Sequence, residues 1–273
     1  MNTFSVPKFL ISLLLALLLG LLILSPAQAI FTRHDQSDSS YVVYAQQYPQ
    51  LFYLHTRFEN KICVATLISQ QWAVTAGHCT EETPMGEMVK AGDVYSVSLD
   101  GQDYTVAELV LHPSYKHPQQ LEAVDLALIK LDRPVTGIRP INLYQGEDEV
   151  DKIVSLVGWG YSGKGNQSRT DNDGQMRRAQ NAVMNAGKWL EFMFDDPRDT
   201  NSTALPLEGV PGLGDSGGPA LLETTQGMMI MGVALGEIDN PNVVQQGGYG
   251  SISLYERIST HYAWVLQVIE ERQ

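Results

Sequence analysis

The chain has 273 residues, with 18 basic against 31 acidic side chains and a formal net charge of −13. This excess of carboxylates argues against nucleic acid as a partner, because phosphate binding needs clustered Lys and Arg. A chain of this length with 44% hydrophobic residues is sufficient for one catalytic unit with a large core.

The first 29 residues have the pattern of a signal peptide. Lys8 is their only charged side chain, residues 9–24 form a leucine-rich apolar run, and residues 27–29 read Ala-Gln-Ala, a small-x-small cleavage site. The run of 16 apolar residues is short for a transmembrane helix, which needs about 20. We therefore expect cleavage after Ala29, a secreted or periplasmic protein without stable membrane insertion, and a mature domain over residues 30–273.

After the leader, short β-prone runs alternate with turn residues. They cover residues 42–45, 51–56, 62–69, 104–111, 126–131, 153–157, 179–182, 220–222, 228–233 and 250–254. Runs of this length and spacing predict an all-β barrel or sandwich. Residues 133–140, which begin with Arg-Pro, are interpreted as the crossover between two halves, and the helical spacing of apolar residues over 255–271 predicts a C-terminal helix.

Two candidate partners in acid–base chemistry lie in the first half. His78 follows a strand-like apolar run in the sequence Thr-Ala-Gly-His-Cys, and an imidazole can accept and return a proton near neutral pH. Asp125 is flanked by apolar residues, where a carboxylate is costly unless a partner uses it, and a bond to a histidine would fix the imidazole tautomer. We interpret the remaining histidines as structural or solvated: His34, His55, His112, His117 and His261.

Ser216 lies in the hexapeptide Gly-Asp-Ser-Gly-Gly-Pro, residues 214–219. A serine hydroxyl becomes a useful nucleophile only with a base and with donors for the oxyanion that forms on attack. Glycines let a substrate carbonyl come close, and the N–H groups of Gly214 and Ser216 are placed to form the oxyanion hole. Taken by itself, the hexapeptide could also be an ordinary loop, because its residues favour turns.

Together these motifs resemble the trypsin/chymotrypsin-type serine proteases. The order His, Asp, Ser is that of this family and differs from the subtilisin and α/β-hydrolase orders, and the spacings of 47 and 91 residues are close to the family's. The resemblance covers the chain after the leader, including Gly-Trp-Gly at 158–160 and Trp264. It implies an all-β fold of two antiparallel six-stranded β-barrels with a C-terminal α-helix and the active site between the barrels. The first barrel would span about 30–138, and the second barrel with the helix about 139–273.

The resemblance also implies a function, namely a secreted serine endopeptidase that acts on proteins or peptides with His78, Asp125 and Ser216 as catalytic residues. It implies no metal and no organic cofactor, and we expect a monomer. A Cys63–Cys79 disulfide beside the catalytic histidine follows from the family, whereas the cysteines alone also allow free thiols or a metal pair. Two alternatives remain open at this point: a catalytically weak binding protein on the same fold, and a non-peptide esterase using the same site.

In the family, a new N-terminal Ile or Val amine pairs with the Asp before the catalytic serine. The matching residues are Ile30 and Asp215, so removal of the signal peptide alone would activate the enzyme. The alternative is a frayed terminus, and Ile30-Phe31 lacks the glycines that usually follow this residue.

The specificity pocket also departs from the family pattern. Its floor, six positions before the serine, is Val210 rather than the Asp of trypsins, so cleavage after Lys or Arg is not expected; Glu208 is another candidate that could reach the pocket. The segment Ala234-Leu235-Gly236 stands where Ser-Trp-Gly is usual. It implies a neutral, apolar pocket and the loss, at Ala234, of a hydroxyl that supports the catalytic Asp.

Overall fold

The computed structural model describes residues 30–56, 60–116, 123–167, 172–238, 243 and 245–272. The predicted signal peptide and His117 lie outside these residues. Within the described ranges, no helix is both long and apolar enough to cross a membrane.

Six strands form the first barrel. They are β2 (Leu51–His55), β3 (Lys61–Leu67), β4 (Trp72–Thr75), β5 (Ser96–Leu99), β6 (Gln102–Leu111) and β7 (Ala127–Leu131), hydrogen-bonded in the order β2-β3-β4-β7-β6-β5 with every pair antiparallel. In β5, Val97 and Leu99 are buried while Ser96 and Ser98 are exposed, as the two-residue period of a strand requires. The sheet closes where His55 N donates to Tyr95 Oη at 2.9 Å.

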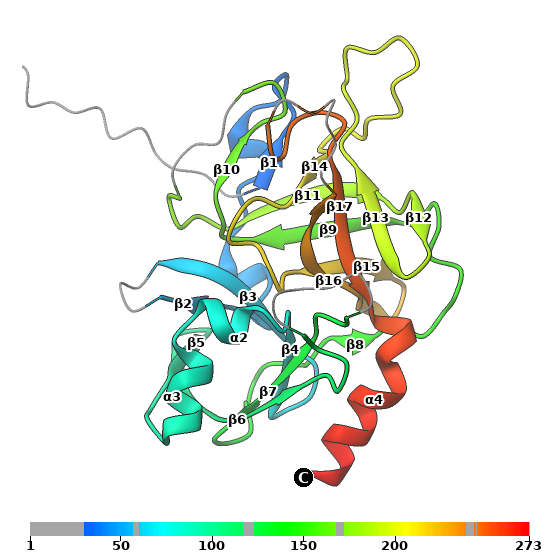
Figure 1. The fold of residues 1–273 in the computed structure, drawn as a ribbon. Helices are drawn as coiled ribbons and strands as arrows, with labels where there is room; N and C mark the ends of the chain where they lie inside the picture. The colour runs from blue at the N-terminus through cyan, green and yellow to red at the C-terminus, as the bar shows by residue number, and fades with distance from the viewer. Residues whose placement is uncertain are drawn as a thin grey trace, which may run out of the picture.

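The second barrel lies against the first and is built on six longer strands (Figure 1). These strands are β9 (Ile153–Gly158), β11 (Arg177–Ala182), β13 (Trp189–Met193), β15 (Pro219–Thr224), β16 (Gly227–Ile238) and β17 (Ile252–Arg257), in the antiparallel order β11-β9-β15-β16-β17-β13. The two-residue strands β12 (Asn185–Ala186) and β8 (Asn142–Leu143) extend this sheet at β13 and β16. Asn181 on β11 donates to the carbonyl of Met193 on β13 at 2.9 Å, which draws the sheet into a barrel. The predicted fold class is confirmed.

The N-terminal segment lies with the second barrel, although the sequence placed it within the first, 30–138. β1 (Ile30–Thr32) pairs in parallel with β10 (Ser162–Lys164) and antiparallel with β14 (Gly209–Val210). Two 3-10 helices follow, η1 (Asp38–Ser40) and η2 (Ala45–Gln47), so no strand forms over 42–45.

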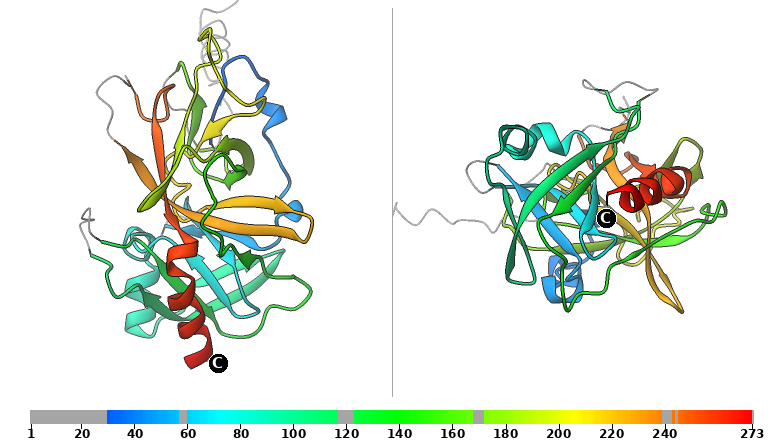
Figure 2. Two further views of the ribbon diagram at one scale, coloured as in Figure 1. Left: turned by 90° about the vertical axis from the view of Figure 1, so that its right-hand side faces the viewer. Right: turned by 90° about the horizontal axis from the view of Figure 1, so that it is seen from below.

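In the described part of the chain, three α-helices complete the fold: α2 (Cys79–Glu82), α3 (Met85–Ala91) and α4 (Ile258–Glu271). The predicted C-terminal helix begins three residues late, because β17 continues through Arg257 in its pairing with β16. Ile258, Val265 and Val268 bury the apolar stripe of α4 in a core cluster that contains residues of both barrels. Since α4 follows β17 of the second barrel directly, it ties the two barrels together (Figure 2).

Candidate active site

His78 and Asp125 form a close hydrogen-bonded pair in the first barrel. His78 follows β4 at the start of α2, and Asp125 precedes β7. The Nδ1 atom of His78 lies 2.5 Å from Oδ2 of Asp125, and the backbone N–H of His78 donates to Oδ1 at 2.8 Å. Asp125 is buried and the imidazole is 13% exposed. Two contacts to one carboxylate fix the ring orientation, with Nε2 on the side of the ring away from Asp125.

The pKa of His78 is raised above its ordinary value. Burial acts to lower it, but the hydrogen bond and negative charge of Asp125 outweigh that effect, with smaller contributions from Glu81 and Glu82. A carboxylate that favours the imidazolium is the electrostatic arrangement that a general base needs, because the imidazolium forms as the base accepts a proton.

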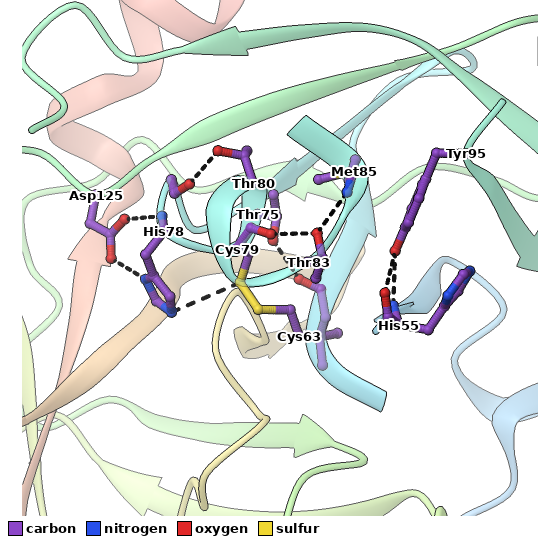
Figure 3. The surroundings of a disulfide bond; sticks show 12 residues. His55, Cys63, Thr75, His78, Cys79, Thr80, Thr83, Met85, Tyr95 and Asp125 are labelled. Carbon is purple, nitrogen blue, oxygen red and sulfur yellow. Dashed lines mark hydrogen bonds and ion pairs between the residues drawn. A yellow bond between two sulfur atoms is a disulfide. The ribbon is translucent and has the colours of Figure 1, made fainter. Parts of the chain in front are cut away.

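The disulfide joins Cys63 on β3 to Cys79 on α2, directly beside His78, as predicted. Figure 3 shows His78 between Asp125 and the disulfide, with its Nε2 atom 3.9 Å from Cys79 Sγ. The bond closes a loop over a sequence separation of 16 that contains β4 and the histidine. The side chains of Cys63, His78 and Cys79 cluster closely enough for a metal site. The two cysteines are bonded to each other, however, so neither supplies a thiolate ligand.

Ser216 lies in the turn before β15, in the second barrel. Its carbonyl accepts from Val64 N on β3 at 2.8 Å, which docks the serine loop onto the first barrel. Gly217 N donates to Ala234 O at 2.8 Å, so β16 holds the loop from the other side. Among the described residues, the N–H groups of Gly214 and Ser216 donate to no backbone carbonyl. These are the two amides that the sequence predicts to form the oxyanion hole.

Asp215, beside the serine, is buried within a shell of backbone donors. Its carboxylate accepts from Gly160 N at 2.6 Å and from Gly212 N at 2.8 Å, and also from the N–H of Ile30. A Cβ atom on Gly158 would lie 2.0 Å from Asp215 Oδ1, so the Gly-Trp-Gly turn needs glycine where it passes this carboxylate. Burial raises the pKa of Asp215 to about 6, although the three N–H donors lower it.

One cavity of about 290 Å³ connects the two barrels at this point. His78 and Ser216 line it together, with Ala234, Leu235 and Gly236 as predicted for the pocket wall. Further lining residues come from five segments: Glu82, Pro211, Gly212, Leu213, Glu237, Gln246 and Ser253.

Val210, the predicted pocket floor, is not among the residues that line this cavity. It is fully buried in a cluster with Phe31 and Phe194, where β14 pairs with β1. Glu208 does not reach the cavity either. Its carboxylate accepts from Leu205 N and Asp195 N, each at 2.7 Å, and holds the loop between them.

The structure adds one residue to the triad region that sequence reasoning missed. Glu256 on β17 is completely buried, and its Oε1 atom accepts from the backbone N–H of Asp125 at 2.8 Å. The two residues are separated by 131 positions, and Glu256 belongs to no motif, so no local signal could have identified it.

Comparison with known proteins agrees with this geometry. The family model described as Trypsin matches residues 40–265. Testisin from Homo sapiens is 27% identical over 244 residues, covering 78% of this chain and 72% of that protein. Trypsin-1 from Astacus astacus is 26% identical over 225 residues, covering 76% of this chain and 88% of that protein. Among solved structures, neuropsin, a serine protease expressed in the limbic system of mouse brain, superimposes with a TM-score of 0.62 at 18% identity, over 84% of this chain and 98% of that one.

Proposed function

The chain belongs to the trypsin family and is a serine endopeptidase, and we propose that it cleaves peptide bonds with Ser216, His78 and Asp125 as its triad. The observation that carries this assignment is the His78–Asp125 pair at 2.5 Å beside a cavity that Ser216 also lines. Such a pair supplies an oriented base, and the cavity supplies the place where a carbonyl carbon can meet the hydroxyl.

In this mechanism, Ser216 Oγ attacks the peptide carbonyl while His78 Nε2 accepts its proton. The N–H groups of Gly214 and Ser216 bind the oxyanion of the tetrahedral intermediate. His78 then protonates the leaving amine, which departs and leaves an acyl-enzyme. Water enters, His78 takes its proton, and collapse of the second intermediate frees the acid and restores Ser216.

We propose that export activates the enzyme, because the cut that removes the leader also releases the amine of Ile30. Ile30 already donates to Asp215 through its N–H, and a free amine there would place a positive charge against a buried carboxylate. Ile30 also has φ 65°, an uncommon value for a β-branched residue. Cleavage before Ile30 removes the preceding carbonyl and with it this strained torsion.

The pocket supports a preference for uncharged side chains before the scissile bond. Pro211, Leu213, Leu235 and Ser253 line it with uncharged side chains. Glu82 and Glu237 are the acidic members of the lining, so basic residues in neighbouring substrate positions are expected to be favoured over acidic ones.

A phosphonyl-fluoride reagent and a mixed peptide library test the assignment together. The mature protein is expected to carry one adduct on Ser216 and to cleave peptides, and Ser216→Ala is expected to lose on the order of a million-fold in turnover. No adduct on Ser216 would refute the triad. An adduct without peptide cleavage would indicate a non-peptide ester substrate, and cleavage mainly after Lys or Arg would refute the assigned pocket.

A further inference from the structure

Asp125 is held by both barrels. Its neighbours in sequence are bonded within the first barrel, because Val124 N donates to Ser114 O at 3.2 Å and Leu126 O accepts from His112 N at 2.9 Å. The N–H of Asp125 itself donates to Glu256 Oε1 in the second barrel, at 2.8 Å. Glu256 is therefore a direct polar link between the acid of the triad and the barrel that carries the serine.

The placement of Glu256 is costly unless it has a use. Its side chain is completely buried, and Oε2 has no hydrogen-bond partner among the described residues. The imidazole of His261 on α4 lies beside it, with Nε2 3.5 Å from Oε2. A buried carboxylate with one bonded and one unbonded oxygen is expensive, so an apolar residue on β17 would serve packing better.

Glu256 also lies near the strand position that, in the resemblance, would carry a supporting hydroxyl for Asp125. Ala234, on the neighbouring strand β16, has no hydroxyl to offer the catalytic carboxylate, and its side chain packs in an apolar cluster with Tyr255. Among the described residues, the hydrogen bonds to the Asp125 carboxylate come from His78, through N and Nδ1. The backbone bond of Asp125 to Glu256 adds an anchor from the second barrel.

We propose that Glu256 is a positioning residue of the active site, which fixes the backbone of Asp125 from the second barrel and thereby sets the orientation of His78 relative to Ser216. The triad is split across the barrels, so its geometry depends on how they are registered. The hydrogen bond between Glu256 and Asp125 fixes the relative position of the two barrels next to the triad. A shift of Asp125 at this point would rotate the imidazole of His78. Misplacement by about 1 Å is enough to cost roughly 100-fold in rate. This inference rests on the triad proposed above.

Two substitutions of Glu256 distinguish the effect of its side-chain length from the effect of its charge. Glu256→Gln keeps an oxygen at the same distance for the N–H of Asp125 but removes the charge, whereas Glu256→Asp keeps the charge and withdraws the oxygen by one methylene. We expect kcat of Glu256→Asp to fall roughly 10- to 100-fold with KM nearly unchanged. Glu256→Gln should stay within about 5-fold of the unsubstituted enzyme, because the acceptor is retained.

Glu149→Gln is the matched control. Glu149 is also a completely buried carboxylate, and it pairs with Arg257, the residue after Glu256, at 2.7 Å. Its substitution is expected to lower the melting temperature as much as Glu256→Asp does, without lowering kcat. In NMR spectra, the far-downfield proton of the 2.5 Å His78–Asp125 hydrogen bond should shift or broaden in Glu256→Asp and remain in Glu149→Gln.

Labelling of Ser216 by the phosphonyl-fluoride reagent in the unsubstituted enzyme is measured first, so that failure of the triad is seen separately. With labelling present, an unchanged kcat in folded Glu256→Asp overturns the positioning role. A larger loss in Glu256→Gln than in Glu256→Asp also overturns it, because charge rather than reach would then matter. If Glu256→Asp does not fold, Glu256→Gln together with the proton resonance decides: a loss beyond about 5-fold with the resonance unchanged refutes the proposal.

Discussion

Signal-peptide removal is expected to stabilise the folded protein in a pH-dependent way, through Asp215. In a chain that still carries Ala29, the carboxylate is buried against neutral N–H donors, and its pKa is raised from 3.8 to about 6. Because the pKa of Asp215 is raised in the folded state, its contribution to folding stability is fully present below about pH 4 and is lost as the pH rises through 6. The shift of roughly two pKa units corresponds to about 3 kcal/mol at pH 7.

A free Ile30 amine removes this penalty while it is charged. We therefore expect the free energy of unfolding of the mature form to exceed that of an Ala29-extended form by up to about 3 kcal/mol at pH 7. This corresponds to roughly 6–12 °C in melting temperature. Relief of the φ 65° torsion at Ile30 adds about 1–2 kcal/mol that does not depend on pH. The difference should thus be small at pH 4, largest near pH 7, and smaller again as the amine, with a reference pKa of about 8, loses its proton.

The assay is thermal unfolding of the two forms, followed by circular dichroism between pH 4 and pH 10, with peptide cleavage measured on the same samples. Carbamylation of the mature amine serves as the control, since it removes the charge without adding a residue. It should bring the stability at pH 7 down toward that of the extended form. A stability difference that is the same at pH 4 and pH 7 would refute the reasoning, as would full activity in the extended form.

Four further outcomes follow from the site and its supports. Replacing Cys63 and Cys79 together by Ala should cost about 3 kcal/mol of unfolding free energy in urea titrations, as for a closed loop of this length. Gly217→Ala should lose activity and roughly 3 kcal/mol, because it has φ +77° and its Cβ would lie 2.3 Å from the β3 backbone; a fully active variant would contradict this. Arg177→Met should destabilise by about 3 kcal/mol by leaving two carboxylates without their buried cation, with near-wild-type stability as the opposing result. The pKa read from the acid limb of kcat/KM should lie above 6.5, because the pKa of His78 is raised and more of the base stays protonated. An acid-limb pKa below 6.5 would argue against His78 as the base.

Strands and their partners were predictable to different degrees. The apolar runs at 51–56, 62–69 and 126–131 became strands near the expected bounds, because local alternation and turn residues suffice for that prediction. The run at 42–45 did not, and β5 and β13 were missed. Their conformation depends on neighbours far along the chain, which local propensity does not report.

Three short motifs and their spacing sufficed to identify the family and the candidate residues His78, Asp125 and Ser216, since each chemical role needs a particular side chain in a particular local turn. The Cys63–Cys79 pairing followed from that resemblance. Tertiary structure alone decided which residues surround them. In the folded chain, Val210 is buried outside the cavity lining, whereas Ser253 belongs to that lining. Glu256 contacts Asp125, although the two residues are 131 positions apart in the sequence. Such contacts depend on how the two barrels pack against each other. No local sequence pattern specifies which residues meet at that interface.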